Sequence, residues 1–339
     1  MKKKILFRAD GSSSMGLGHL FRLLALVEMF KEDYEYIYLT NASTTTEVIP
    51  SKYKTRIIPE LISFSEEPIW LSKNYPASEH LIIADGYQFD SQYQKEIKKL
   101  GYTLVYIDDL ATEHMYADLV VNHSPNIKEK DFKSELYTSF ALGIDYAILR
   151  PGFIKEAKVQ KKIEYIKNVF VCFGGSDYHD LTNKCIQGII DLKEINIIHI
   201  VIGGAYKHTE IFKTIKNKEN RVLIHQNLSE EKMLDVMRGC QLAIVPSSTI
   251  CYEVCSSKMI IISGFYVDNQ INIYNGMNKK EMIYGVGDFN QLSSNDFKNK
   301  TLHVLNDSYE EYEKKLNIQK TLFDGLVKER FLSLINKLN

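Results

Sequence analysis

One histidine lies where the chain is expected to turn from a strand into a helix. The stretch FRADGSSSMGLGHLFRLLAL covers residues 7–26 and places His19 directly behind Gly16 and Gly18. Glycine-rich turns of this kind commonly bind phosphate, because the amino terminus of a helix has free N–H groups and the positive end of the helix dipole. A diphosphate suits such a turn, and an imidazole beside it adds a group that can accept a proton.

The same stretch predicts how His19 is presented. If KILFRAD forms the first strand, Gly18 or His19 begins a helix through LFRLLALVEMF. Gly16 and Gly18 then permit positive φ and the close approach of a ligand. The helix dipole favours the neutral imidazole, which is the form that a general base needs. The alternative is a histidine that only caps the turn or packs inside the fold.

Asp10 ends the expected first strand and is a candidate partner of His19. A carboxylate there can hold the second ring nitrogen and fix the tautomer. It can equally be a loop carboxylate that accepts backbone N–H groups. A dinucleotide-binding fingerprint is incomplete, because Phe21 occupies the position of its third glycine, and the chain has no G-x-x-x-x-G-K-[ST] run. Neither NAD nor a P-loop nucleotide is therefore supported.

Short apolar runs alternate with amphipathic segments twice along the chain. The first series is KILFRA, YEYIYLT, TRIIPE, HLIIADG, TLVYIDD and ADLVVNH, and the second is NVFVCFGG, IIHIVIGG, RVLIHQN, LAIVPSS and MIIISGF. Buried strands alternating with helices predict parallel sheets with right-handed crossovers. The expected fold is α/β, with two doubly wound Rossmann-like domains facing a cleft. Ligands of such sheets bind at the carboxyl ends of the strands.

The expected domain bounds follow from this alternation. Residues 1–150 form an N-terminal Rossmann-like domain with His19, and residues 166–290 form a second one. Between them, 151–166 contains a Pro-Gly pair and a lysine-rich stretch, which is typical of a linker. Residues 291–339 have helical periodicity, and we expect part of this segment to pack back on the N-terminal domain.

Composition narrows the function classes. Lys and Arg number 42 against 43 Asp and Glu, so the formal charge of −1 supplies no field for nucleic acid or an anionic membrane. No apolar run has the length of a signal peptide or a membrane span, so we expect a cytoplasmic protein without membrane insertion. The five cysteines lie in apolar segments without C-x-x-C spacing, which favours buried, reduced thiols over disulfides or zinc.

A family resemblance emerges from the order of the motifs. FRADGSSSMGLGHLFR resembles the amino-terminal signature of the UDP-sugar hydrolases of pseudaminic acid biosynthesis, which are related to the MurG-like glycosyltransferases of GT-B fold. The resemblance continues through LIIADGY, VYIDD, ADLVVNHS, LGIDYAILRPGF, FVCFGGSD, VPSSTICYEV and NQINI. It covers about residues 5–280, and the order of the motifs makes it specific.

The resemblance implies a hydrolase that removes UDP from a diacetamido-trideoxy-L-altrose without a metal or cofactor. His19 matches the histidine that activates water for attack at the anomeric carbon, and attack in one step implies inversion. Asp10 matches the strand-end aspartate, and Tyr87 matches a tyrosine that can bind the sugar or the departing phosphate. Arg22 belongs to the same motif and is expected to contact the substrate. We expect a monomer whose partner is a small-molecule UDP-sugar.

The second half of the chain is expected to bind the nucleotide. Its candidate residues are Gly174, Gly175, Ser176, Ser247, Ser248, Thr249, Glu253, Asn269 and Gln270. The Gly-Gly-Ser turn offers backbone N–H groups to a diphosphate, and the three hydroxyl residues can cap a helix whose amino terminus faces phosphate. By resemblance, Glu253 accepts the ribose hydroxyls and the Asn-Gln pair lies near the donor sugar. The alternatives are an ordinary glycine turn, an exposed helical glutamate, and capping of the next helix by Asp268 and Asn269.

Three further polar residues follow strands. Asp108 and Asp109 are adjacent, so their side chains point to opposite sides of a strand, which favours strand-end hydrogen bonding over a Mg²⁺ site. His123 is either a second substrate contact or a loop histidine. The functional alternatives are a hydrolase of a related nucleotide-linked acetamido sugar, a GT-B glycosyltransferase that uses a UDP-sugar donor, and a protein that binds a nucleotide-sugar without turnover.

Overall fold

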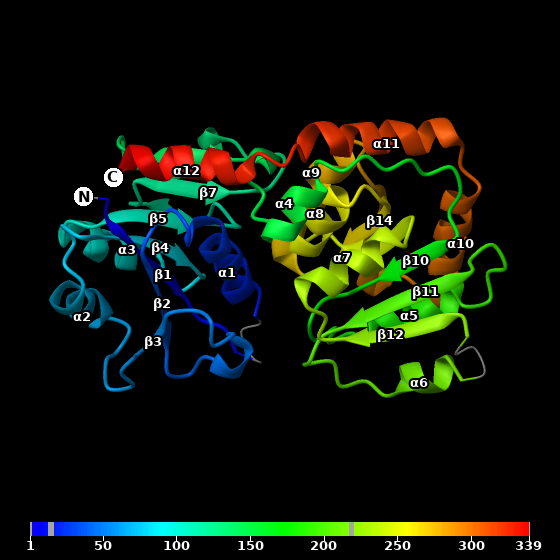
Figure 1. Cartoon of the computed structure of the whole chain (residues 1–339), viewed down its shortest axis with the longest axis horizontal. Helices are drawn as coiled ribbons and strands as arrows, with labels where there is room; N and C mark the ends of the chain where they lie inside the picture. Colours follow the sequence, from blue (N-terminus) through cyan, green and yellow to red (C-terminus); the bar gives the residue numbers. More distant parts are fainter. Residues whose placement is uncertain (1, 13–16, 217–219, 339) are drawn as a thin grey trace. The chain divides into compact units, whose positions relative to one another are not determined.

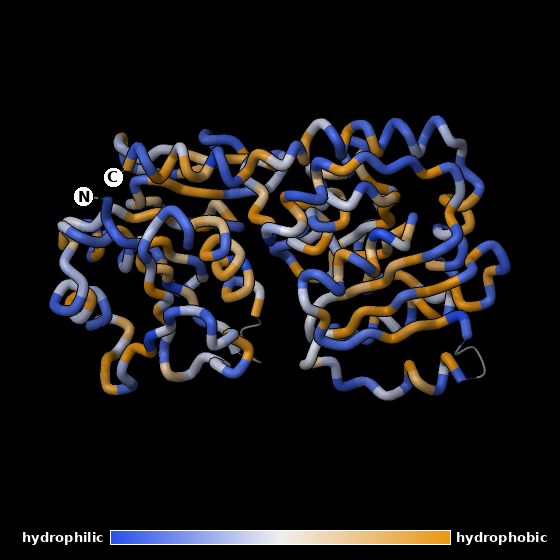
Figure 2. Tube along the Cα trace, in the orientation of Figure 1, coloured by the Kyte–Doolittle hydropathy of each residue, from blue (hydrophilic) through white to orange (hydrophobic). Residues whose placement is uncertain are grey.

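The chain forms two units, each built around a parallel sheet (Figure 1). The structure is a computed structural model that describes residues 2–12, 17–216 and 220–338. The first unit comprises Met1–Pro151 and Leu326–Asn339, and the second comprises Gly152–Gly325. Apolar residues run along the strands of both sheets, as Figure 2 shows, so each unit has its own core.

The first sheet has seven strands in the order β3-β2-β1-β4-β5-β7-β9, and all its neighbouring pairs are parallel. Its strands are β1 (Lys4–Ala9), β2 (Tyr36–Asn41), β3 (Thr55–Ile58), β4 (His80–Asp85), β5 (Thr103–Ile107), β7 (Leu119–Asn122) and β9 (Ser139–Leu142). Its helices are α1 (Gly18–Phe30), α2 (Glu67–Asn74), α3 (Ser91–Lys99) and α12 (Val327–Leu338), and a short strand pair joins β6 (His114–Met115) to β8 (Lys133–Ser134). The strand order reverses between β1 and β4, which is where ligands bind in sheets of this type.

The second sheet has six parallel strands in the order β12-β11-β10-β13-β14-β15. They are β10 (Asn168–Val171), β11 (Ile197–Ile202), β12 (Val222–Gln226), β13 (Leu242–Pro246), β14 (Ile260–Phe265) and β15 (Tyr284–Asp288). The helices are α4 (Pro151–Glu156), α5 (Leu181–Ile189), α6 (Glu210–Thr214), α7 (Glu230–Arg238), α8 (Thr249–Ser256), α9 (Ile271–Lys279), α10 (Ser294–Leu305) and α11 (Tyr309–Leu322). Here the order reverses between β10 and β13.

The predicted fold class is confirmed, because every apolar run singled out in the sequence contains a strand of one of the two parallel sheets. Two sheet strands, β9 and β15, are additional to those predicted, and the segment expected as a linker begins with the short helix α4. All five cysteines are buried and free, as predicted. Among the helices in the described part of the chain, none is both long and apolar enough for a membrane span.

The last helix, α12, packs in the first unit although more than 170 residues separate it from the rest of that unit (Figure 1). Its buried side chains are Val327, Phe331 and Ile335. The Phe331 ring lies edge-on to Phe30 of α1, with ring centroids 6.3 Å apart, and 5.7 Å from the ring of Tyr146. These contacts make α12 part of the core beside α1, the helix that carries His19.

Phe331→Ala is expected to lower the free energy of unfolding by roughly 3 kcal/mol, because it removes a buried ring and leaves a cavity beside Phe30. Urea denaturation, followed by circular dichroism, measures this loss. Leu326→Ala is the matched control, since that side chain is 44% exposed and should change stability far less. Equal losses in the two variants would contradict a core role for α12.

Candidate functional site

The candidate site in the first unit lies at the carboxyl ends of β1, β4, β5 and β7. Asp10 follows β1, Asp85 ends β4, and Asp109 comes shortly after β5. Because parallel strands end at one edge of their sheet, these side chains gather at the point where the strand order reverses. The helix α1 begins at the same edge and brings His19 and Arg22 to it through the contacts described below.

His19 occupies the first turn of α1, as predicted from the sequence. The helix begins at Gly18, and its N-cap residue, Leu17, makes no side-chain capping bond. Gly18 does not have positive φ, so the conformational freedom that a glycine permits is not used there, and an added Cβ at Gly18 would meet nothing within 4 Å among the described residues. Gly16 lies outside the described residues.

The partner of His19 is Asp85, a residue that was not expected from the sequence. Nδ1 of His19 is 2.8 Å from Oδ1 of Asp85, and the carboxylate is fully buried. Arg22, one helical turn after His19, donates to the same carboxylate from Nε over 2.7 Å and from Nη2 over 2.6 Å. Arg22 also donates to both oxygens of Asp109, over 2.5 Å from Nη1 and 3.0 Å from Nη2.

Counting hydrogens fixes the tautomer of His19. Nη2 of Arg22 carries two hydrogens, and its shorter contacts direct them to Asp85 and Asp109. Its remaining contact, 3.2 Å to Nδ1 of His19, therefore has no hydrogen of its own. Nδ1 must carry the proton and donate it to Asp85. Nε2 then holds a lone pair, and it has no hydrogen-bond partner within the described ranges, so it is placed to accept a proton.

The charges of this group are strongly coupled. Burial alone would raise the pKa of Asp109, but the charge and hydrogen bonds of Arg22 lower that pKa to about 2. Burial likewise opposes ionisation of Asp85, and Arg22 again lowers the pKa below its usual value. Both carboxylates are consequently ionised at neutral pH. A positive charge on His19 after proton uptake would face ionised oxygens.

Tyr87 lies beside His19, as expected for two residues of one site. Their rings meet edge-on, with centroids 4.6 Å apart. The Tyr87 hydroxyl is 3.4 Å from Oδ2 of Asp109, a long contact, and 47% of the residue is exposed. Its hydroxyl therefore lies at the surface of the group that Arg22 holds together.

Asp10 does not hold His19, and the predicted pairing was wrong. Its carboxylate is buried and accepts from Arg8 over 2.5 Å, from the backbone N–H of Asn41 over 2.8 Å, and from Gln88 over 3.2 Å. Arg8 is also buried and forms a second, bidentate pair with Glu67 at 2.8 and 2.9 Å. Asp10 thus accepts a backbone N–H, as in the alternative interpretation of this residue, but that N–H belongs to the end of β2 and not to the strand-to-helix turn.

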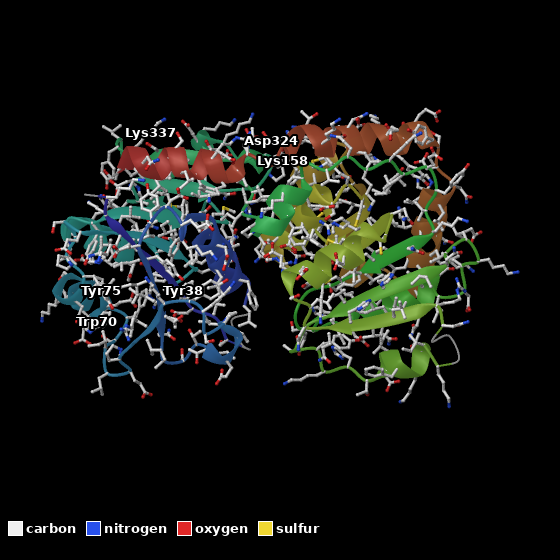
Figure 3. All side chains as sticks on the ribbon, viewed as in Figure 1. Tyr38, Trp70, Tyr75, Lys158, Asp324 and Lys337 are labelled. Atoms are coloured by element: carbon white, nitrogen blue, oxygen red, sulfur yellow. The ribbon has the colours of Figure 1, made fainter. Side chains whose placement is uncertain are left out.

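Tyr38 of β2, labelled in Figure 3, lies in the interior of the first unit close to this group. Burial, and then the negative charges of Asp85 and Asp10, raise the pKa of its hydroxyl well above the usual value. Nearby, Asp108 accepts hydrogen bonds from the side chain of Asn122 and the backbone of Ala111, as predicted for a strand end. The contacts of His19 are instead with Asp85 and Tyr87.

His123 is buried and neutral. Burial, assisted by the charge of Arg22, lowers its pKa to about 4. Its Nδ1 accepts a long hydrogen bond, 3.4 Å, from the backbone N–H of Ile148. The contact favours a structural histidine over a second substrate contact. No group of three or more potential metal ligands occurs in the described part of the chain.

In the second unit, a glycine turn follows β10. Gly174 has a φ of +93°, and Gly175 and Ser176 are exposed. Two hydrogen bonds stabilise the turn. The hydroxyl of Tyr266 donates to the carbonyl of Phe173 over 3.1 Å, and the side chain of Gln270 accepts from the backbone N–H of Tyr266 over 3.0 Å. Gln270 is therefore buried and supports the turn, whereas Asn269 is exposed.

The helix α8 begins as predicted after the serine run, but its capping differs. Ser248 is the N-cap residue and makes no side-chain capping bond, so the predicted capping was wrong. Ser247 is buried and its Oγ is 2.8 Å from Oγ of Ser263, while Ser248 and Thr249 are half-buried. Glu253 is buried, contrary to the exposed alternative. The N-cap residue of helix α9 is Gln270, which makes no side-chain capping bond, so neither Asp268 nor Asn269 occupies the N-cap position.

Two known proteins are similar to the chain over most of its length. No protein-family model matches the chain. A UDP-2,4-diacetamido-2,4,6-trideoxy-beta-L-altropyranose hydrolase of Campylobacter jejuni is 25% identical over 283 residues, which cover 82% of this chain and 97% of that protein. An uncharacterized protein of Methanocaldococcus jannaschii is 26% identical over 289 residues, covering 82% of this chain but 58% of the archaeal protein.

Among solved structures, MurG of Acinetobacter baumannii superposes with a TM-score of 0.65 at 12% identity, over 99% of both chains. At that identity the likeness concerns the fold. The chain is thus similar over most of its length to the Campylobacter UDP-sugar hydrolase, and its two Rossmann-like units have the GT-B fold of MurG.

Proposed function

We propose that this chain processes UDP-sugars, and that it is a hydrolase releasing UDP from UDP-2,4-diacetamido-2,4,6-trideoxy-L-altrose. The observation that carries the proposal is the state of His19: its Nδ1–H donates to buried Asp85, and its Nε2 has no partner in the described ranges. An imidazole held in this way is a general base. The similarity to the Campylobacter hydrolase supports the choice of substrate.

The proposed reaction is a single displacement. Water forms a bond to the anomeric carbon while Nε2 of His19 takes one of its protons. The bond from that carbon to the diphosphate oxygen breaks, and its electron pair leaves with UDP. Asp85 stabilises the imidazolium that results, and one attack from the opposite face gives an inverted sugar. The free sugar and UDP are the products, and no metal or cofactor takes part.

The nucleotide is assigned to the second unit. Backbone N–H groups of Gly174, Gly175 and Ser176, and the amino terminus of α8, suit a diphosphate because they carry positive dipole ends without a full charge. Ser247, Ser248 and Thr249 are assigned with that helix end. Glu253 is assigned to the ribose hydroxyls, and Asn269 and Gln270 to the region of the donor sugar, with Gln270 acting through the turn that it supports.

The test follows UDP release by ³¹P and ¹H NMR, with EDTA present and no acceptor, in water enriched in ¹⁸O. We expect release from the altrose compound, little from UDP-GlcNAc, and the label in the sugar, because the carbon–oxygen bond is the one that breaks. Label in UDP would contradict the mechanism. Binding without release would instead favour a GT-B glycosyltransferase that lacks its acceptor, or a binding protein, and equal release from both substrates would favour a hydrolase of another acetamido sugar.

A further inference from the structure

The Arg22 side chain is almost fully committed within the protein. A guanidinium has five N–H groups, and Arg22 uses four of them on Asp85 and Asp109. The residue is 7% exposed. One N–H on Nη1 is left for any other partner. Arg22 therefore cannot form the bidentate hydrogen bonds with which arginine usually binds a phosphate.

The charge around Arg22 also disfavours phosphate. One cation faces two carboxylates, both ionised, so the group has a net negative charge when His19 is neutral. A diphosphate placed here would be repelled. A cation is favoured instead, and the cations that the proposed reaction creates are the imidazolium of His19 and the positive charge that develops on the sugar ring.

Each of the two carboxylates contacts a different residue of the site. Asp85 accepts from Nδ1 of His19, and Asp109 is the carboxylate nearest the Tyr87 hydroxyl. Arg22 joins them with two bidentate pairs, a geometry that fixes the plane of each carboxylate. Holding both carboxylates therefore sets the tautomer and orientation of His19 and the position of Tyr87, whose ring contacts the imidazole.

We propose that Arg22 is a positioning residue, which acts on His19 through Asp85 and on Tyr87 through Asp109, and that it does not bind the phosphates of the substrate. The inference rests on the proposed function, because that function defines the reaction of His19. The tautomer and orientation of His19 do not depend on the substrate, so the positioning role of Arg22 and the proposed function can be tested separately.

The first variant is Asp109→Asn, which keeps the size of the side chain and removes one charge. We expect kcat to fall about 10- to 100-fold, the range found when a hydrogen-bond partner of a functional histidine is lost at metal sites. The dissociation constant of UDP, measured by calorimetry, should stay within about twofold, because the site of the nucleotide is untouched. The acidic limb of the pH–rate profile should move to lower pH, because the loss of one negative charge makes the imidazolium of His19 less favourable.

The second variant, Arg22→Gln, should move the acidic limb the opposite way, to higher pH, because it removes a positive charge. The groups that face His19 are Asp85, Asp109, Arg22 and Tyr87, with His123 near Asp109. Opposite shifts from the two changes are a signature that general structural damage does not produce. Arg22→Lys, which keeps the charge but loses the paired geometry, should restore the limb and only part of kcat.

The control is Asp108→Asn, the same chemical change one residue away. Asp108 accepts from Asn122 and the Ala111 backbone and does not contact Arg22 or His19. The acidic limb of the pH–rate profile should shift clearly less in Asp108→Asn than in Asp109→Asn. The inference would be overturned if Asp109→Asn had a normal kcat and an unchanged pH–rate profile. It would also be overturned if the dissociation constant of UDP rose at least about tenfold in Arg22→Lys.

A readout without substrate separates this inference from the proposed function. ¹H–¹⁵N NMR of the imidazoles, with His19 assigned by its loss in His19→Asn, reports the tautomer and its titration. We expect the Nδ1–H form in the wild type and a titration midpoint that moves down in Asp109→Asn. If the enzyme fails to hydrolyse the altrose compound but these shifts occur, the function is wrong and the positioning role stands. If the enzyme hydrolyses the altrose compound but these shifts do not occur, the proposed function stands and the positioning role of Arg22 is wrong.

Discussion

His19→Asn is expected to lower kcat for UDP release by a factor of about 10² to 10⁴, the usual contribution of a general base. The asparagine keeps a polar group next to Asp85 but cannot take up the proton of the attacking water. The change also removes the ring that contacts Tyr87, but the pairs of Arg22 with Asp85 and Asp109 do not involve the imidazole and should persist. The dissociation constant of UDP should therefore remain within about twofold of the wild-type value.

Single-turnover assays measure this effect on chemistry, and calorimetry measures UDP binding. A matched control is His114→Asn, because His114 is a 39% exposed histidine that pairs with Glu135 and lies in the short β6–β8 sheet. That variant should turn over at the wild-type rate. Near-normal turnover by His19→Asn would remove His19 from the catalytic role, and a parallel loss of UDP binding would show that the change damaged more than the base.

The fold could be predicted from the sequence because several strands of each sheet are apolar on both faces. Runs such as those of β4 and β13 are buried at every position, and a run of that kind is recognisable without any partner. The strand β15, YGVGD, is half-buried throughout and contains two glycines, so it has no apolar run to detect. The strand β9 covers only Ser139–Leu142 at the edge of its sheet.

The position of His19 could also be predicted, because it depends on local signals: an apolar strand, glycines and then an amphipathic helix. The identity of its partner could not. Asp10 and Asp85 both stand at the ends of neighbouring strands, and sequence alone does not reveal which one faces α1. One signal was available, since residues two apart share a face of a strand, which places Arg8 beside Asp10. Glu67, the other partner of Arg8, is 59 residues distant and only the folded chain reveals it.

Two separate arginine groups lie at this edge of the first sheet, one fully buried and one beside the partly exposed His19. Arg8 ties β1 to α2 through buried Glu67, and to the end of β2 through buried Asp10. Arg22 ties α1 to β4 and to the loop after β5, where His19 retains 17% exposure of its side chain. A buried charged pair gives little net stability but costs much when it is broken, so these groups hold a defined geometry more than they add free energy.

Arg8→Met is expected to lower the free energy of unfolding by about 3–5 kcal/mol at neutral pH, the cost of breaking a buried ion pair. The change leaves the carboxylates of Asp10 and Glu67 buried without their cation. Urea denaturation provides the measurement. The matched control is Lys4→Met on the same strand, because Lys4 pairs with Glu35 at the surface and its loss should leave stability close to that of the wild type.

The pH dependence distinguishes this cause from a simple packing defect. Burial alone would raise the pKa of Asp10, but Arg8, the Asn41 backbone and Thr40 lower it in the wild type, so its contribution is present above the unfolded pKa and is lost as the pH falls. Without Arg8, burial dominates and protonation of the carboxylate becomes favourable. The deficit of Arg8→Met relative to the wild type should therefore shrink between about pH 7 and about pH 4. A deficit independent of pH would mean that lost packing against Phe89, 5.1 Å from the guanidinium, causes the instability instead.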